Sequence, residues 1–203
     1  IALNSAYGAL GNQWFRFYDV RNAEAVSVAG QLSIRWAERA VNQYLNKVLV
    51  TENDDYVLAS DTDSLYVTFD SLVQKVGLTD TNKIIEFMDK VCEGKIQDVI
   101  DGCYGEMAEY VNAFEQKMVM KREVLAEVAI WTGKKHYILN VHNSEGVQYD
   151  EPKLKIMGIE AVKSSTPEPC RNALKEALKI MMNGTEEDVI NYIEGFKTKF
   201  KSL

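Results

Sequence analysis

The spacing of hydrophobic positions predicts helices near both ends of the chain. Apolar residues recur at helical intervals from Asn22 to Val48, which indicates one long, well-buried helix. Residues 4–12 are small and include two glycines, which predicts the end of a helix running into a turn. Helical spacing returns from Thr81 to Phe114, where we expect two helices with a break near Asp101-Gly102.

Short β-prone runs occupy the middle of the chain. Residues 56–59 and 65–69 flank Ser60-Asp61-Thr62-Asp63-Ser64 and predict a β-hairpin with a tight acidic turn. Residues 116–130 and 135–142 predict two further strands. A long helix followed by a hairpin, helices, strands and a helical tail indicates an α+β fold, with an antiparallel sheet flanked by helices.

The C-terminal part of the chain has helical spacing in two segments. Ser165 or Thr166 would cap the first of these helices, with Pro167 near its start. Asn183-Gly184 would end it, and the second helix would begin at Thr185.

Composition is that of an ordinary folded protein, with 46% hydrophobic and 26% charged residues among 203. No apolar run approaches the ~20 residues of a membrane span and no secretion leader is present, so we expect a cytoplasmic protein without a membrane partner. Three widely spaced cysteines argue against a disulfide framework or structural zinc and predict buried thiols. The first residue is Ile, which suggests a piece of a longer chain.

The net charge of −7 is unfavourable for phosphate binding, but the charge is unevenly distributed. Most of the acidic excess precedes residue 117, and Lys and Arg slightly outnumber Asp and Glu beyond it. The basic residues of this later stretch include Lys121, Arg122, Lys134, Lys135, Lys153, Lys155 and Lys163. A basic stretch beside an acidic region is compatible with a nucleic-acid partner.

The acidic turn Asp61-Thr62-Asp63-Ser64 is the sharpest candidate for chemistry. Carboxylates at i and i+2 near a strand end point to one side, because side chains alternate along a strand. Two neighbouring carboxylates repel each other unless a cation lies between them, and hard oxygen ligands on a short turn suit Mg²⁺. The alternative interpretation is an ordinary Asp-rich turn with solvated side chains.

Two other motifs are ambiguous when taken singly. Asn4-Ser5-Ala6-Tyr7-Gly8 is also typical of a tightly packed helix of small residues. In Thr132-Gly133-Lys134-Lys135-His136-Tyr137, taken as a strand, Lys135 and Tyr137 share a face that could follow a phosphate backbone and a base edge. The alternative is a solvated, charged edge strand.

The order of these motifs resembles the family B DNA polymerases, in particular the replicative enzymes of T-even-like phages. NSxYG, a long helix, DTDS in a hairpin and KKxY on a later strand follow one another as in that family. The stretches YGALGN, WFRFYDVRNA, WTGKKHY, EPKLKIMGIE and KSSTP are similar to blocks of those enzymes. The resemblance implies the end of the fingers in residues 1–20, the palm in 21–164 and the beginning of a helical thumb in 165–203.

The resemblance implies a catalytic role for the acidic turn. Asp63 matches the aspartate that ligates both catalytic metals, and Asp61 matches one that shapes the site. Thr62 lies at the turn apex near the primer end and the nucleotide, and Glu123 resembles a further carboxylate close to the metals.

It also implies binding roles for the other motifs. Asn4, Tyr7 and Gly8 match the fingers motif that packs on the incoming nucleotide. Lys134, Lys135 and Tyr137 match the motif that holds the primer strand, and Lys163 resembles a thumb-base lysine that touches DNA.

The function implied is template-dependent transfer of dNTPs to a primer 3′-hydroxyl with two Mg²⁺ ions. The family's motif A aspartate and fingers lysine have no match here, so we expect the chain alone to be inactive without the N-terminal exonuclease, motif A and fingers segments. A sliding clamp would bind through a C-terminal segment that is also unmatched. Two alternatives are a split-polymerase subunit and a non-catalytic module that binds primer–template DNA; a third is a structural α+β protein whose DxD is only a turn.

Overall fold

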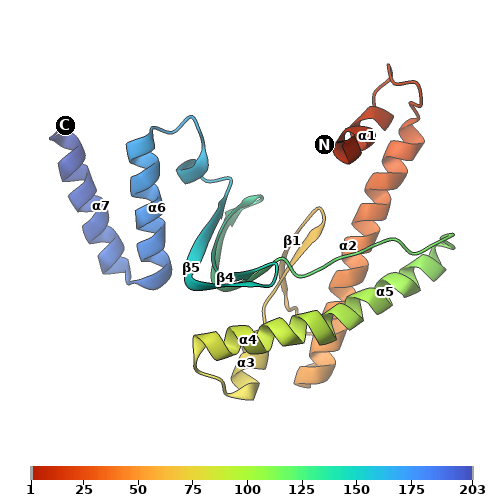
Figure 1. The fold of residues 1–203 in the computed structure, drawn as a ribbon, viewed down its shortest axis with the longest axis horizontal. Helices are drawn as coiled ribbons and strands as arrows, with labels where there is room; N and C mark the ends of the chain where they lie inside the picture. Colours follow the sequence, from red (N-terminus) through yellow and green to blue (C-terminus); the bar gives the residue numbers. More distant parts are fainter. Residues whose placement is uncertain (1, 203) are drawn as a thin grey trace. The chain divides into compact units, whose positions relative to one another are not determined.

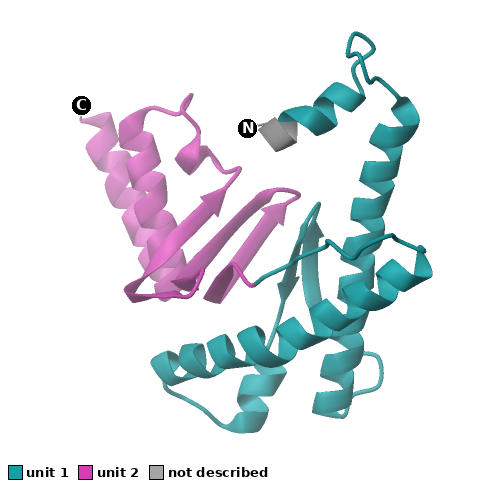
Figure 2. Cartoon of the chain, turned by 45° about the vertical axis from the view of Figure 1, so that its right-hand side comes forward, with its two compact units in different colours: residues 1–121 teal, residues 122–203 magenta. Residues whose placement is uncertain are grey.

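The computed structural model describes residues 2–202 and shows helices combined with antiparallel sheets, which confirms the predicted α+β class (Figure 1). The chain forms two compact units, residues 1–121 (unit 1) and 122–203 (unit 2) (Figure 2). None of the described helices is long and apolar enough to cross a membrane.

Unit 1 is built on one long helix, as the periodicity predicted. The Asp19 side chain accepts a hydrogen bond from the Arg21 N–H and caps this helix, α2.

The elements of unit 1 are α1 (Ala2–Leu10), α2 (Val20–Leu49), β1 (Val57–Asp61), β2 (Ser64–Val67), α3 (Asp70–Val76), α4 (Thr81–Val91), a π-helical turn (Cys92–Ile96) and α5 (Gln97–Tyr110). The predicted hairpin is confirmed, with a turn shorter than expected.

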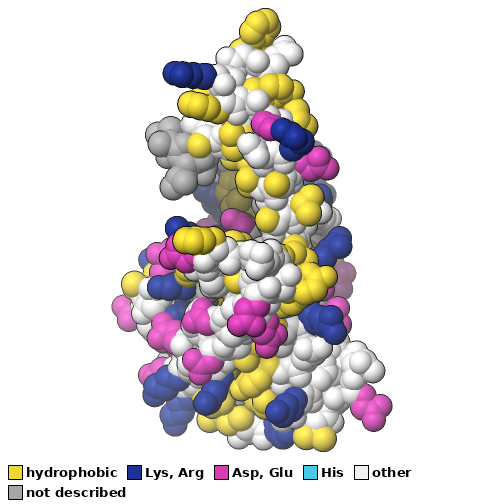
Figure 3. Space-filling view, turned by 90° about the vertical axis from the view of Figure 1, so that its right-hand side faces the viewer, with side chains coloured by type: hydrophobic (Ala, Val, Ile, Leu, Met, Phe, Trp, Pro, Cys, Tyr) yellow, Lys and Arg dark blue, Asp and Glu magenta, His cyan; other side chains and the backbone are white. Residues whose placement is uncertain are grey.

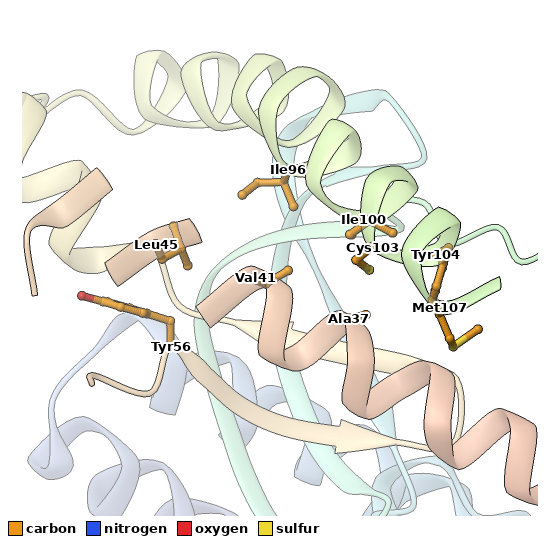
Figure 4. Packing of buried hydrophobic residues seen from close by; sticks show 9 residues of the cluster. All are labelled: Ala37, Val41, Leu45, Tyr56, Ile96, Ile100, Cys103, Tyr104 and Met107. Carbon is orange, nitrogen blue, oxygen red and sulfur yellow. The ribbon is translucent and has the colours of Figure 1, made fainter. Parts of the chain in front are cut away.

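The core of unit 1 lies between α2 and α5 (Figure 4). Ala37, Val41 and Leu45 recur every fourth residue of α2 and are almost fully buried. Tyr104 of α5 packs into the same cluster. The prediction that the whole of α2 is well buried is wrong for its first half, where large apolar side chains are exposed.

Exposed apolar side chains of unit 1 can be seen in Figure 3 among charged groups of both signs. By exposed fraction, the large exposed apolar residues of unit 1 include Trp14, Phe17, Val20, Val26 and Val28, in the turn before α2 and along its first turns. Asp and Glu outnumber Lys and Arg in unit 1, whereas the two kinds are equal in number in unit 2. The net charge of −7 therefore belongs to unit 1.

The predicted helix break near Asp101-Gly102 is wrong. α5 runs through both residues, and the irregularity is the π-helical turn at Cys92–Ile96. Glycine lowers helix stability by about 1 kcal/mol relative to alanine. Burial of Ile100, Cys103 and Tyr104 on the same helix offsets that cost, because each would lose its apolar contacts if the helix broke there.

Unit 2 is a three-stranded antiparallel sheet followed by two helices. Its strands are β3 (Val124–Gly133), β4 (His136–Ser144) and β5 (Val147–Met157), in the order β3-β4-β5. The central strand β4 is buried on both faces. The predicted strand over 116–130 starts only at Val124, and β5 was not predicted, because its polar residues and Pro152 are typical of a loop. An edge strand tolerates proline, since one side of its backbone needs no partner.

A short 3₁₀ turn (Glu160–Val162) leads to α6 (Glu168–Asn183) and α7 (Glu186–Lys201). The predicted cap of α6 by Ser165 or Thr166 is wrong, since Pro167 occupies the N-cap and makes no side-chain cap bond. The predicted start of α7 is confirmed: Thr185 and Asp188 form a reciprocal capping box.

Two of the three cysteines are buried as predicted, Cys92 and Cys103, whereas Cys170 is only partly buried. Burial, together with the smaller effect of the nearby carboxylates of Glu106 and Asp101, raises the pKa of the Cys103 thiol to about 11. Cys103 is therefore a protonated core residue at neutral pH.

Candidate functional site

The acidic turn joins β1 to β2 at the tip of the hairpin in unit 1. Asp61 pairs with Ser64, which leaves Thr62 and Asp63 as the loop. The Asp63 N–H donates to the Asp61 carbonyl at 2.6 Å, closing a tight turn centred on Thr62, whose φ is 55°. A β-branched residue at positive φ is rare, and such strain costs about 1–3 kcal/mol. The hairpin therefore holds the turn in a conformation that its sequence does not favour.

Hydrogen bonds within the turn fix Asp61 more than Asp63. The Thr62 hydroxyl donates to Asp61 Oδ1 at 3.0 Å, and the Ser64 hydroxyl donates to the Asp61 carbonyl at 3.1 Å. Asp63 is exposed, and its carboxylate makes no hydrogen bond or ion pair with the described side chains. Strand alternation ends at Asp61, so the expected sharing of one face does not follow from a continuing strand. The Asp63 oxygens are open to a ligand from outside the hairpin.

The donor chemistry of this turn fits Mg²⁺, which takes hard oxygen ligands and uses one or two protein carboxylates beside waters and phosphates. Asp61 and Asp63 are both carboxylates on one short turn. Among the described residues, no group of three or more His, Cys, Asp or Glu is arranged to hold a metal ion. The turn thus offers part of a ligand set.

Tyr7, from the N-terminal motif, is fixed to α2 by its hydroxyl. Tyr7 Oη lies 2.6 Å from Ser27 Oγ, and Ser27 Oγ donates to the Ala23 carbonyl at 3.2 Å. Because the single Ser27 hydroxyl hydrogen is used in that bond, the Tyr7 hydroxyl is the donor. The Tyr7 side chain is nevertheless about half exposed, at 48%.

The other two residues of this motif are less informative. Gly8 has open space where a side chain would begin. Asn4 lies on α1, but its side chain is outside the part of the chain that the structure describes.

The basic turn joins β3 to β4 in unit 2. Gly133 pairs with His136, so the two lysines, Lys134 and Lys135, form the loop and not part of a strand as predicted. Lys135 has a φ of 62°. His136 Nδ1 lies 2.7 Å from the Lys134 carbonyl, and since a carbonyl only accepts, Nδ1 carries the hydrogen. The turn therefore presents two cationic side chains at the end of the sheet.

Tyr137 follows this turn on the central strand. It pairs with Trp131 of β3 and with Met157 of β5, and it is 9% exposed. The alternative of a solvated edge strand is therefore wrong for this motif. Tyr137 is part of the packed sheet that supports the turn.

Glu123 and Lys163 each have a partner of opposite charge in unit 2. Glu123 Oε1 forms an ion pair with Lys155 Nζ of β5. Lys163 Nζ donates to Glu160 Oε1 at 2.5 Å, and this hydrogen bond is the main reason that the pKa of Glu160 is lowered. Lys155 was predicted only as one residue of the basic stretch, and its ion pair with Glu123 was not predicted. The alternation of Lys153 and Lys155 within β5 was the signal for it, but only once β5 is known to be a strand.

Comparison with known families identifies the class of protein to which this chain belongs. The "Divergent Family B DNA polymerase" profile matches residues 49–194, which is most of the chain. The chain therefore belongs to the family B DNA polymerases. The matched range contains the acidic turn and the basic turn.

Two curated relatives are phage enzymes. The chain is 47% identical over 197 residues to a DNA-directed DNA polymerase of Escherichia phage RB69, a match that covers 92% of the chain and 22% of the relative. It is 41% identical over 214 aligned residues to a DNA-directed DNA polymerase of Enterobacteria phage T4, covering 100% of the chain and 24% of the relative. The resemblance to T-even-like phage polymerases is thereby confirmed, and the chain spans about a quarter of the length of these relatives.

Proposed function

We propose that this chain is the palm-centred part of a template-dependent DNA polymerase, which adds dNTPs to the 3′-hydroxyl of a primer. The observation that carries the proposal is the open carboxylate of Asp63 at the tip of a strained hairpin, in a chain of this family. The two phage relatives are both named DNA-directed DNA polymerases, and these names support the proposal that the substrates are dNTPs and a primed DNA template.

The residues of the acidic turn hold the reacting groups. Asp63, with Asp61 beside it, would bind Mg²⁺, and Glu123 would balance charge near the ions. When bound, two such ions lower the pKa of the primer 3′-hydroxyl and neutralise charge on the triphosphate. Thr62 keeps the turn closed through its hydroxyl bond to Asp61, so that the Asp63 carboxylate projects from a fixed backbone.

Other residues position the nucleic acid and the nucleotide. The turn lysines Lys134 and Lys135 bind phosphates of the primer strand, and Tyr137 supports them from the sheet. Lys163 contacts DNA from the segment after β5. The N-terminal motif, Asn4, Tyr7 and Gly8, packs on the incoming nucleotide, with the Tyr7 ring fixed by its bond to Ser27.

The remaining parts of the catalyst lie elsewhere in the polymerase. The phage relatives are about four times as long as their matched segments, which leaves room for a motif A aspartate, a fingers lysine, an exonuclease and a clamp-binding tail. We assign residues 1–20 to the fingers, 21–164 to the palm and 165–203 to the thumb. On this proposal the chain alone does not polymerise.

A second candidate is a module that holds primer–template DNA for a catalytic partner chain. It is favoured by one observation: the described residues contain no group of three metal-binding side chains. In that case the basic turn would bind DNA and Asp63 would be an ordinary turn residue.

Primer extension with Mg²⁺ and four dNTPs separates the two candidates. The assay compares the chain alone, the chain mixed with an N-terminal fragment that carries motif A, and the same mixture with Asp63→Ala. Glu52→Ala, which removes an exposed carboxylate from another loop of unit 1, is the matched control. We expect extension only in the unmodified mixture and in the Glu52→Ala mixture. Equal extension with Asp63→Ala would support the DNA-holding module instead.

A further inference from the structure

We propose that Gly158 is a positioning residue that sets the backbone of the basic turn and so aligns Lys134 and Lys135 with the primer phosphates. This inference rests on the proposed DNA-binding role of the turn. It assigns a function to a glycine that follows β5 and that lies far from Lys134 and Lys135 in the sequence.

The main observation is a close approach of two backbones. Gly158 has a φ of +71°, and a Cβ at this position would overlap the carbonyl oxygen of Lys135. It would also lie 2.9 Å from Cδ2 and 3.1 Å from Cγ of the His136 ring. The obstruction includes backbone, which cannot turn aside as a flexible side chain can. Only glycine allows the chain to pass the turn at this distance.

Other glycines with positive φ do not share this environment. Gly77 and Gly146 have φ values of +75° and +84°, and a Cβ added to either would meet nothing within 4 Å. At those two positions glycine satisfies the backbone conformation alone. At Gly158 it satisfies both the conformation and the approach to Lys135.

Both lysine carbonyls of the turn are thereby constrained by neighbours. The His136 ring donates through Nδ1 to the Lys134 carbonyl at 2.7 Å, while its carbon atoms face Gly158. Tyr137 pairs with Met157, so the residues next to the turn and next to Gly158 are joined in the sheet. Lys135 is held at a φ of 62°, which an L-residue does not favour. The contact from Gly158 helps to keep it there.

Gly158 also stands where the chain leaves the sheet towards Lys163. The 3₁₀ turn Glu160–Val162 follows directly, and Glu160 accepts the hydrogen bond from Lys163 Nζ. The pKa of Glu160 is lowered chiefly by that bond and, to a smaller extent, by the nearby His136. A shift of Gly158 would therefore disturb the basic turn and the lysine that follows β5 together.

The test compares Gly158→Ala with Gly146→Ala in the full 203-residue chain. Both substitutions place alanine at a positive φ in unit 2, but only the first meets the basic turn. The measurement is the affinity for a fluorescent primer–template duplex at several NaCl concentrations, below the melting temperature of each variant. We expect Gly158→Ala to weaken binding by about tenfold. The salt slope, which is the slope of the logarithm of the binding constant against the logarithm of the NaCl concentration, should fall in magnitude by about one, as for a lost phosphate contact. Gly146→Ala should stay within about twofold of the unmodified chain, since its effect is on stability.

A purely structural role would lower the melting temperature and leave the salt slope unchanged. Equal affinity and equal slope for the two glycine variants would overturn the proposal. His136→Ala tests the same contact without adding a clash, and it remains informative if Gly158→Ala does not fold. We expect it to weaken DNA binding by about threefold, because the Nδ1 bond to the Lys134 carbonyl is lost while both lysine side chains remain. No change in this variant would also count against the proposal.

Failure of the proposed function has a different signature. A Lys134→Ala/Lys135→Ala variant with unchanged affinity would show that the turn does not bind DNA. Amide NMR shifts of Lys135 in Gly158→Ala and Gly146→Ala then report directly whether Gly158 sets the backbone. A large shift in Gly158→Ala alone would show that Gly158 sets the backbone of the turn, although the turn does not bind the primer.

Discussion

The acidic turn of unit 1 and the basic turn of unit 2 have similar backbone conformations but are held by different contacts. Each joins two antiparallel strands through two loop residues, and each holds one non-glycine residue at positive φ, Thr62 at 55° and Lys135 at 62°. The acidic turn is closed by bonds among its own residues. The basic turn is held partly by its own His136 and partly by Gly158, from beyond the next strand.

This difference in contacts agrees with the function proposed for each turn. A metal ligand needs a carboxylate on a rigid backbone with its oxygens open, and a self-contained turn provides that with Asp63. Phosphate binding along a strand needs cations in register with an extended partner. A turn tied to β5 and to the segment that carries Lys163 can hold several cations in one arrangement.

The largest expected effect is from the acidic turn. In the complete polymerase, Asp63→Ala should reduce the rate of nucleotide incorporation by about 10³-fold, because metal binding supplies several kcal/mol of charge stabilisation. DNA affinity should change little, since the phosphate-binding lysines remain. Single-turnover incorporation and duplex binding measure the two effects separately. A loss of affinity with an unchanged rate would reverse the roles that we assign to the two turns.

The next effect is from the basic turn. Lys134→Ala/Lys135→Ala should weaken binding of primer–template by roughly tenfold or more and reduce the salt slope by about 2, one for each phosphate contact. The incorporation rate at saturating DNA should stay near that of the unmodified enzyme. Lys197→Ala/Lys199→Ala, two lysines of α7, is the matched control, because it removes the same charge from the same unit. An equal loss of affinity in this control would mean that the net charge of unit 2, and not the position of the two turn lysines, determines DNA binding.

Sequence alone predicted the acidic turn well, because its determinants are local. Two β-prone runs and the polar residues between them specify the hairpin, and Asp61 to Ser64 make their own hydrogen bonds. In the basic turn, Thr132 to Tyr137 were interpreted as a strand and a strand was predicted to begin at Lys135, so the loop formed by Lys134 and Lys135 was missed. Their conformation depends on the pairing of β4 with β5, and β5 itself was not recognised.

The helical parts show the same division between local and distant causes. The capping box at Thr185 was predictable from adjacent residues, as was the long α2. The continuity of α5 through Gly102 was not, since it depends on packing against α2. Gly158 gave no signal in the sequence either, because the atom that requires glycine there belongs to Lys135.

The smallest expected effect tests whether the strain at the acidic turn serves a function. Val50 ends α2 at φ 62° and is 83% exposed, so Val50→Gly should raise the free energy of unfolding by about 1 kcal/mol through relief of the left-handed conformation. Thr62→Gly relieves a similar φ but loses the hydroxyl bond to Asp61, so we expect only about 0.5 kcal/mol. Urea denaturation of the chain measures both. In the complete polymerase, Val50→Gly should leave incorporation unchanged, whereas Thr62→Gly should slow it, because a looser turn no longer holds Asp63 in place. Equal activity of the two variants would mean that the strain at Thr62 is a property of the hairpin with no part in catalysis.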